Sequence, residues 1–76
     1  MKEIDITLRS ISDIRNFVNA VTLLDYEVDL RQGRYLVDAK SIMGIFALDT
    51  LSPITVIAHS DDTDELVNAI DAFIVK

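Results

Sequence analysis

Residues 40–48 read Lys40-Ser41-Ile42-Met43-Gly44-Ile45-Phe46-Ala47-Leu48 and contain the longest uninterrupted apolar run of the sequence, from Ile42 to Leu48. The serine before the run is typical of a helix N-cap, because its hydroxyl can accept a hydrogen bond from a backbone N–H that has no partner inside the helix. The run is too short to cross a membrane, which takes about 20 apolar residues. A short helix that is apolar nearly all round can bury only part of itself, so we expect some of these side chains to stay available to a partner protein.

The composition is that of one small globular domain, which we expect to span residues 1–76. Half of the residues are apolar and 26% are charged, which is a globular balance and not a disordered one. The absence of cysteine excludes disulfides, thiolate zinc sites and cysteine nucleophiles, and the single histidine argues against a histidine-based metal cage. We therefore expect neither a metal nor a cofactor.

The formal net charge of −6 limits the classes of partner. It argues against nucleic acid, whose binding depends on Lys and Arg neutralising phosphates, and against an anionic membrane surface. The opening residues, 1–5, alternate polar and apolar side chains instead of forming a basic segment followed by an apolar one. We expect a cytoplasmic protein whose partners are other proteins.

Hydrophobic periodicity predicts the elements before residue 40. Apolar and polar side chains alternate over residues 3–9, as in a half-buried strand, and apolar side chains then recur at helical spacing from Ile11 to Leu24. Ser10 and Ser12 are both candidate N-caps of this helix. Residues 26–31 alternate again, and Gln32-Gly33 is expected to turn the chain into a third strand over 34–39, which makes a hairpin.

The elements after residue 48 complete an α+β order, β-α-β-β-α-β-α. Residues 49–53 predict a loop, β-branched residues favour a strand over 54–58, and the acidic residues of 62–65 suit the start of a last helix. Because each strand has one apolar face and each helix one apolar stripe, we predict two layers. All helices should cover one face of a mostly antiparallel sheet, and the opposite face should be wet and acidic.

This order, together with the motif Lys40-Ser41-Ile42-Met43-Gly44, resembles the HPr family, the small histidine-containing phosphocarriers of the bacterial sugar phosphotransferase system. The motif is similar to the family's regulatory-serine motif, and residues 37–39 fit the family's third strand. The resemblance covers nearly the whole chain. It implies the open-faced two-layer β-sandwich of that family.

The chain departs from the family at the position of the carrier histidine. In the family this histidine caps the first helix and is followed, two residues on, by an arginine and then a proline. Counting back from Ser41 without gaps places Ser10 there, in the segment Ser10-Ile11-Ser12-Asp13. Phosphoserine is a stable ester whereas phosphohistidine transfers its phosphoryl group readily, so we predict that phosphorelay activity is lost. The loop 49–53 also looks shorter than the family's loop and lacks its glycines.

The resemblance implies that Ser41 is the serine that HPr kinase phosphorylates. Phosphorylation would add about −1.5 to −2 charge at a helix N-terminus. The competing interpretation is a plain N-cap, which is common enough to need no further role.

The predicted docking residues are Ile42, Phe46 and Leu48, with Lys40 beside them. A two-turn helix cannot direct five large side chains at one core, so at least two should be exposed, and exposed apolar patches usually mark interaction sites. The competing interpretation is that these side chains only fill a small core. In the family, the same region docks partner enzymes and, when the serine is phosphorylated, a transcriptional regulator.

His59 is interpreted as an ordinary surface histidine near acidic residues. We do not interpret Ser10, Asp13 and His59 as a catalytic triad, because nothing in the sequence brings them together. The carboxylates of residues 61, 62 and 64 lack the glycine and the spaced glutamate of a calcium loop, and are interpreted as the start of a helix.

Three functional hypotheses follow. The first is a regulatory adaptor of HPr type with no catalysis of its own, similar to the family's catabolite-repression paralogue that lacks the carrier histidine. Its partners would be HPr kinase, a transcriptional regulator or phosphotransferase-system enzymes. The second is a phosphocarrier with a non-standard acceptor such as His59. The third is a small-molecule-sensing domain of ACT type, which shares the two-layer layout but does not explain the Ser41 motif.

Overall fold

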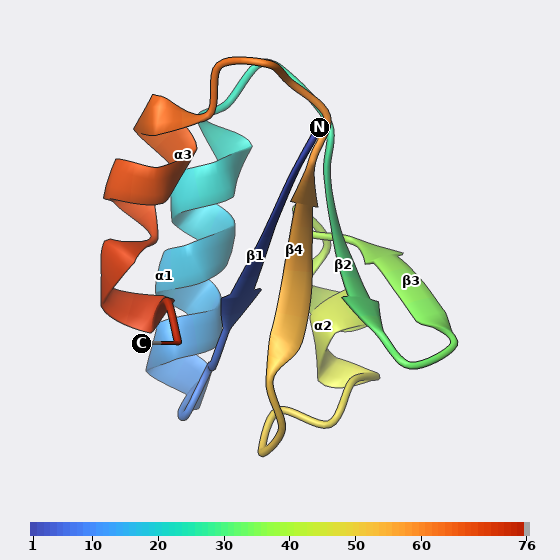
Figure 1. Cartoon of the computed structure of the whole chain (residues 1–76). Coiled ribbons are helices and arrows are strands. Elements are labelled where there is room, and N and C mark those ends of the chain that lie inside the picture. Colours follow the sequence, from blue (N-terminus) through green and yellow to red (C-terminus); the bar gives the residue numbers. More distant parts are fainter. Residues whose placement is uncertain (76) are drawn as a thin grey trace.

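A computed structural model describes residues 1–75, and their helices and strands follow the predicted order (Figure 1). The elements are β1 (Lys2–Ile6), α1 (Ile11–Thr22), β2 (Val28–Gln32), β3 (Tyr35–Asp38), α2 (Ile42–Phe46), β4 (Ile54–Ala58), α3 (Asp64–Ala69) and a short 3-10 helix, η1 (Asp71–Phe73). The α+β class and the β-α-β-β-α-β-α order are thus confirmed. Within the described residues, no helix is both long enough and apolar enough to span a bilayer.

The four strands form one antiparallel sheet in the order β1-β4-β2-β3. β4 lies between β1 and β2, with Lys2 opposite Ala58 at one end of its ladder with β1 and Ile6 opposite Ile54 at the other. The last described residues cover the free edge of β1, since the N–H of Val75 donates to the Asp5 carbonyl at 2.9 Å. β3 forms the opposite edge of the sheet.

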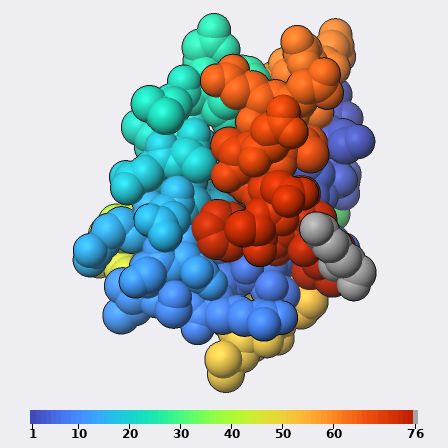
Figure 2. Space-filling view, turned by 90° about the vertical axis from the view of Figure 1, so that its left-hand side faces the viewer, coloured from blue at the N-terminus to red at the C-terminus, as the bar shows by residue number. Residues whose placement is uncertain are grey.

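One face of the sheet carries the hydrophobic core, and all three α-helices pack on it. The core joins buried side chains from the strands to buried side chains from each helix, among them Phe17 of α1, Ile45 of α2 and Leu66 of α3. The ring of Phe17 meets that of Phe73 edge to face, with centroids 6.3 Å apart. α1 and α3 lie side by side over their part of this face (Figure 2). The predicted two-layer, one-sided architecture is confirmed.

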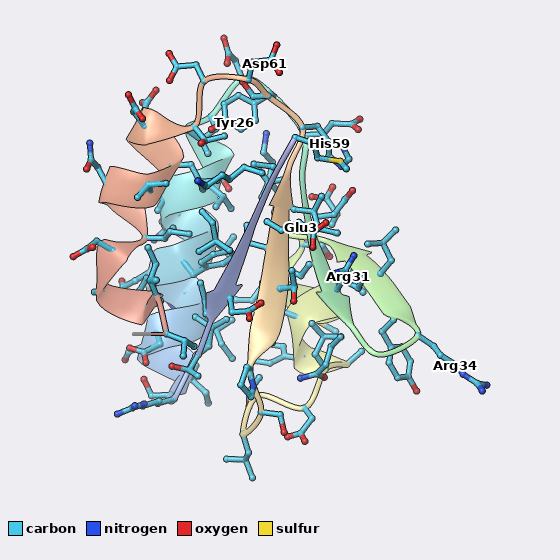
Figure 3. All side chains as sticks on the ribbon, viewed as in Figure 1. Glu3, Tyr26, Arg31, Arg34, His59 and Asp61 are labelled. Carbon is cyan, nitrogen blue, oxygen red and sulfur yellow. The ribbon has the colours of Figure 1, made fainter. Side chains whose placement is uncertain are left out.

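The opposite face of the sheet is polar and mostly acidic, as predicted, and its side chains pair across strands (Figure 3). Arg31 Nη2 lies 2.8 Å from Glu3 Oε1, and His59 Nε2 lies 2.8 Å from Asp29 Oδ2. The Thr55 hydroxyl donates to Asp5 Oδ1, also at 2.8 Å. Exposed pairs of this kind add little stability, so this face keeps the sheet soluble and does not hold it together.

The hairpin turn lies one residue later than predicted, at Gly33-Arg34, because Gln32 still pairs with Tyr35 as the last residue of β2. Gly33 adopts a φ of +59°, which a glycine accepts without a steric penalty. The Gln32 side chain also holds the loop 49–53: its Nε2 donates to the Asp49 carbonyl at 2.6 Å, and its Oε1 accepts from the Asp49 N–H at 2.7 Å.

Other element ends also differ from the predictions by a few residues. α1 ends at Thr22, although Leu24 beyond it is buried, and β1 ends at Ile6, although Leu8 is buried. Tyr26, predicted to open the second strand, precedes it. In each case an apolar side chain reaches the core from irregular backbone, which periodicity cannot distinguish from a continued element.

Candidate functional site

Two helix starts carry the sequence-predicted sites, and the first is the N-terminus of α1. Ser10 caps this helix, since its Oγ accepts the Asp13 N–H at 3.1 Å. Asp13 in turn accepts the Arg9 N–H at 2.9 Å through Oδ2, so two otherwise unpaired N–H groups are satisfied by neighbouring side chains. Ser12, the other predicted cap, is instead the second residue of the helix. The Ser10 hydroxyl therefore has a structural contact at the position that resembles the family's carrier site.

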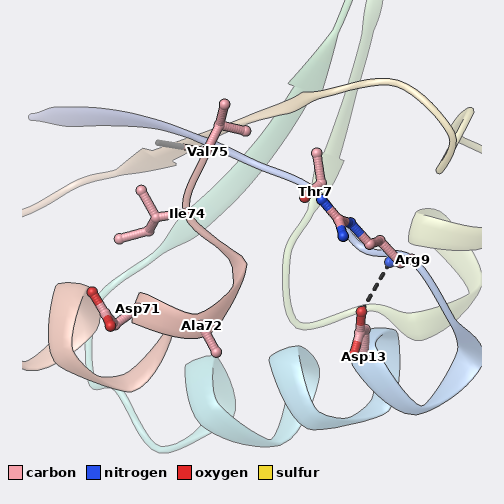
Figure 4. A pocket seen from close by; sticks show the side chains of 7 residues that line it. All are labelled: Thr7, Arg9, Asp13, Asp71, Ala72, Ile74 and Val75. Atoms are coloured by element: carbon pink, nitrogen blue, oxygen red, sulfur yellow. Dashed lines mark hydrogen bonds between the residues drawn. The ribbon is translucent and has the colours of Figure 1, made fainter.

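An open hollow of about 470 Å³ lies beside this helix start and under the last described residues (Figure 4). Three charged residues line it together with small and apolar ones: Thr7, Arg9, Asp13, Asp71, Ala72, Ile74 and Val75. None of these lining residues is a histidine.

His59, the one histidine of the sequence, lies at the other end of the sheet (Figure 3). It follows Ala58, which pairs with Lys2, whereas Ser10 comes after Ile6 at the far end of the same ladder. Four residue steps of strand separate the two ends of that ladder, or about 13 Å. The partner of His59 is Asp29 on β2 and not the neighbouring residues 60–62 that the sequence suggested. The structure thus keeps Ser10, Asp13 and His59 from forming a triad.

The second predicted site is the N-terminus of α2, where Ser41 is the N-cap as predicted. Its Oγ accepts the Gly44 N–H at 3.2 Å, and its carbonyl accepts the Ile45 N–H at 3.1 Å. Gly44 allows α2 to lie close to β3, because a Cβ at this position would come within 3.2 Å of Val37 Cβ. Ser41 as a residue is half-buried.

α2 divides its apolar side chains between the core and solvent. Ile45 is fully buried, Ile42 is half-buried against the core, and Met43 and Phe46 are 75% and 47% exposed. A helix turns about 100° per residue, so a helix that directs Ile45 inward must direct Met43 and Phe46 elsewhere. The expectation that at least two of these residues are exposed is confirmed. The two residues form what we call the α2 surface, defined as Met43 and Phe46.

Two of the predicted docking residues have other positions in the structure. Leu48 is buried, because the chain leaves the helix after Phe46 and directs this side chain back into the core, so it does not reach the surface. Lys40 directs its ammonium group inward: Nζ donates to the Leu24 carbonyl just beyond α1, at 2.9 Å. The Lys40 ammonium thus stabilises the carbonyl end of α1, where a positive charge is favourable.

Met43 was absent from the predicted docking set although it is the most exposed residue of α2. Its spacing of three residues from Phe46 is the signal that could have identified it, since residues three apart share a helix face. The pairing of Asp29 with His59 was also missed, because no sequence pattern brings residues from β2 and the end of β4 together.

The acidic segment after His59 borders a second open hollow, near Tyr26 (Figure 3). Burial of the Tyr26 hydroxyl raises its pKa, and the negative charges of Glu65, Asp62 and Asp25 raise it further. Asp64 begins α3 as predicted, and its N–H donates to Asp62 Oδ1 at 3.3 Å. Within residues 1–75 no group of three or more acidic or histidine side chains is arranged to hold a metal ion.

Comparison with known proteins identifies a family and solved structures of similar fold. Residues 11–76 match the family described as "PTS HPr component phosphorylation site". The match includes Ser41 and begins directly after Ser10. The crystal structure of HPr-C-His from Thermoanaerobacter tengcongensis has the same fold, with a TM-score of 0.78 and 24% sequence identity over 95% of this chain and 89% of that chain. No curated protein sequence matches this chain.

The cap of α1 predicts a difference between two neighbouring serines. Ser10→Ala should lower the free energy of unfolding by about 1 kcal/mol, because the Asp13 N–H loses its acceptor. Ser12→Ala, inside the helix and exposed, should change it by less than about 0.5 kcal/mol. Urea unfolding of the two variants measures both values, and equal losses would contradict the assignment of Ser10 as the cap.

Proposed function

This chain belongs to the HPr family, whose model matches residues 11–76, and on that premise we propose that it is a regulatory adaptor of the phosphotransferase system. The adaptor binds partner proteins through the α2 surface, and phosphorylation of Ser41 regulates this binding. Its partners are HPr kinase, a transcriptional regulator or phosphotransferase-system enzymes, in the cytoplasm. One observation carries the proposal: the family's serine motif caps a helix with exposed apolar side chains, while the chain's one histidine lies away from the first helix start.

The position of His59 favours an adaptor over a phosphocarrier. In this family the carrier imidazole caps the first helix. Here that helix begins with a serine whose hydroxyl accepts a backbone N–H, and a serine phosphate would be a stable ester. His59 is bonded to Asp29 at the opposite end of the sheet. Its phosphorylation would require a different docking mode.

The position of Ser41 supports a switch that acts on the α2 surface. Its Oγ lies over the first turn of α2, two residues before Met43 in sequence, whereas Ile45 faces the core. A phosphate there adds about −1.5 to −2 charge beside apolar side chains that a partner would bury. Phosphorylation therefore changes the surface that partners meet and leaves the buried packing of α2 in place.

The ACT alternative receives no support from the comparisons. The family match and the similar solved structure both identify an HPr fold. The sequence motif around Ser41 also has no role in a small-molecule sensor.

Incubation with Enzyme I and phosphoenolpyruvate separates the adaptor from a carrier. We expect no acid-labile label on this protein, because no imidazole lies at the start of α1, whereas a histidine-containing HPr in a parallel reaction is labelled. Labelling that disappears in the His59→Ala variant would overturn the adaptor proposal in favour of the carrier.

Incubation with HPr kinase and ATP tests Ser41. Wild type should take up close to one phosphate, and Ser41→Ala should take up none, because the acceptor hydroxyl is removed. Ser52→Ala is the matched control, since Ser52 is a half-buried loop serine outside the motif, and it should be labelled like wild type. Removal of the Ser41 cap should cost only about 1 kcal/mol, so circular dichroism should show that the variant is folded. Equal labelling of Ser41→Ala and wild type would contradict the assignment.

Truncation of Phe46 tests the α2 surface. Phe46→Ala should weaken binding to HPr kinase about tenfold, as removal of an aromatic side chain from an interface often does, while unfolding changes by less than about 1 kcal/mol. Leu48→Ala is the matched control: it should cost about 2–5 kcal/mol of stability because Leu48 is in the core. Isothermal titration and urea unfolding measure both quantities. A Phe46→Ala variant as unstable as Leu48→Ala would show that Phe46 supports the core instead.

A further inference from the structure

β3 presents an edge of unpaired backbone groups. The N–H of Ala39 donates to the Val28 carbonyl at 2.9 Å, and Val37 lies opposite Leu30. In an antiparallel ladder every second residue bonds to the neighbouring strand, so the backbone of residues 35, 37 and 39 faces β2. The N–H and C=O of Leu36 therefore point away from the sheet. Among residues 1–75, no strand lies on that side (Figure 1).

The exposed side chains of this edge are large and apolar. Tyr35 and Leu36 are each 62% exposed, although edge strands of monomeric proteins are usually protected by charges, bulges or a covering segment. The other edge of the sheet is covered at one end, since the Val75 N–H donates to the Asp5 carbonyl and the Phe73 carbonyl accepts the Thr7 N–H. The two edges of this sheet thus differ within residues 1–75: the β3 edge has no covering segment and offers both large exposed apolar side chains and outward backbone groups.

The sequence along this edge complements itself. Two copies of Arg34-Tyr35-Leu36-Val37-Asp38, aligned antiparallel about Leu36, place Leu36 opposite Leu36 and Tyr35 opposite Val37. They also place each Arg34 opposite the Asp38 of the other copy. Aromatic with β-branched and opposite-charge pairs are both favourable across strands. A parallel alignment would place like charges together, and a shift of two residues would leave Arg34 without Asp38.

The charges of Arg34, in the turn before β3, and Asp38, the last residue of β3, favour this alignment further. Asp38 lies opposite Asp29 in the sheet, where like charges repel. Asp29 is paired with His59, whereas the Asp38 carboxylate accepts the neutral Lys40 N–H at 2.8 Å and has no cation partner within residues 1–75. Arg34 extends away from the body of the molecule (Figure 3), with no carboxylate partner within residues 1–75. A second copy supplies the cation that Asp38 lacks and the anion that Arg34 lacks.

We propose that two copies of this chain associate by antiparallel pairing of their β3 strands, about a twofold axis at Leu36. The pairing makes one continuous eight-stranded sheet, four strands from each copy. The two Leu36 residues exchange both of their backbone hydrogen bonds, and two Arg34–Asp38 pairs close the ends. This association is independent of the proposed role of Ser41 and the α2 surface.

Sedimentation velocity from micromolar to millimolar concentration tests the dimer. The average mass of wild type should rise from 8.5 kDa toward twice that value. Leu36→Pro should remain monomeric, because proline removes the outward N–H while the bonds between β3 and β2 stay in place. Arg15→Asp, a charge reversal on the exposed surface of α1, is the matched control and should dimerise like wild type.

A charge-swap mixture tests the register. Arg34→Asp alone places aspartate opposite Asp38, and Asp38→Arg alone places arginine opposite Arg34, so each variant should be monomeric. An equimolar mixture of the two should recover dimers, because every facing pair is then of opposite charge. Circular dichroism checks that each variant is folded. If Asp38→Arg does not fold, Leu36→Pro and Arg34→Asp alone still test the proposal. Wild type that stays monomeric, dimers that survive Leu36→Pro, or a mixture of folded variants that stays monomeric would each overturn the proposal.

Discussion

The single apolar face of the sheet is the constraint on which the rest of this structure depends. Strand side chains alternate, so Ile6, Leu30 and Val56 meet in one layer while Asp5, Arg31 and Thr55 face water. Every helix then packs on this side, because the other face is mostly polar and offers only Ile57 and Leu36 as large apolar side chains. The polar face carries the charged or titratable side chains of Glu3, Asp5, Asp29, Arg31, Asp38 and His59, and all of these except Asp38 pair with a side chain of another strand or of its end.

This constraint also explains why the α2 surface exists. α2 has five residues, and only Ile45 is fully buried in the core. The other apolar side chains of α2 cannot all be directed into the core as well, so Met43 and Phe46 remain exposed to solvent, near the cap residue Ser41. A longer helix could have turned a polar face outward. The exposed residues of α2 therefore follow from the shortness of this apolar helix, and the proposed partner binding would use them.

The two capping serines show how the same local chemistry can have different functional meaning. Ser10 and Ser41 each accept the N–H three residues ahead, at 3.1 and 3.2 Å. By the sequence resemblance, the first stands at the position of the family's carrier histidine, and a serine phosphate is a stable ester. The second lies in the motif that resembles the family's regulatory serine, and it adjoins exposed apolar side chains. The proposed function depends on this contrast between a lost acceptor and a retained one.

Local pattern in the sequence determined the element order, the one-sided packing, both helix caps and the acidic sheet face, because each follows from spacing, propensity or composition over a few residues. The burial and contacts of individual side chains depended on tertiary structure. Leu48 is buried because the chain bends after α2, Lys40 reaches a carbonyl beyond α1, and His59 meets Asp29 from another strand. These contacts join residues distant in sequence, and the directions of their side chains are set by how the layers pack, which no local window contains. The open edge of β3 was decided in the same way: the strand was predictable, but only the sheet order left one of its sides unpaired.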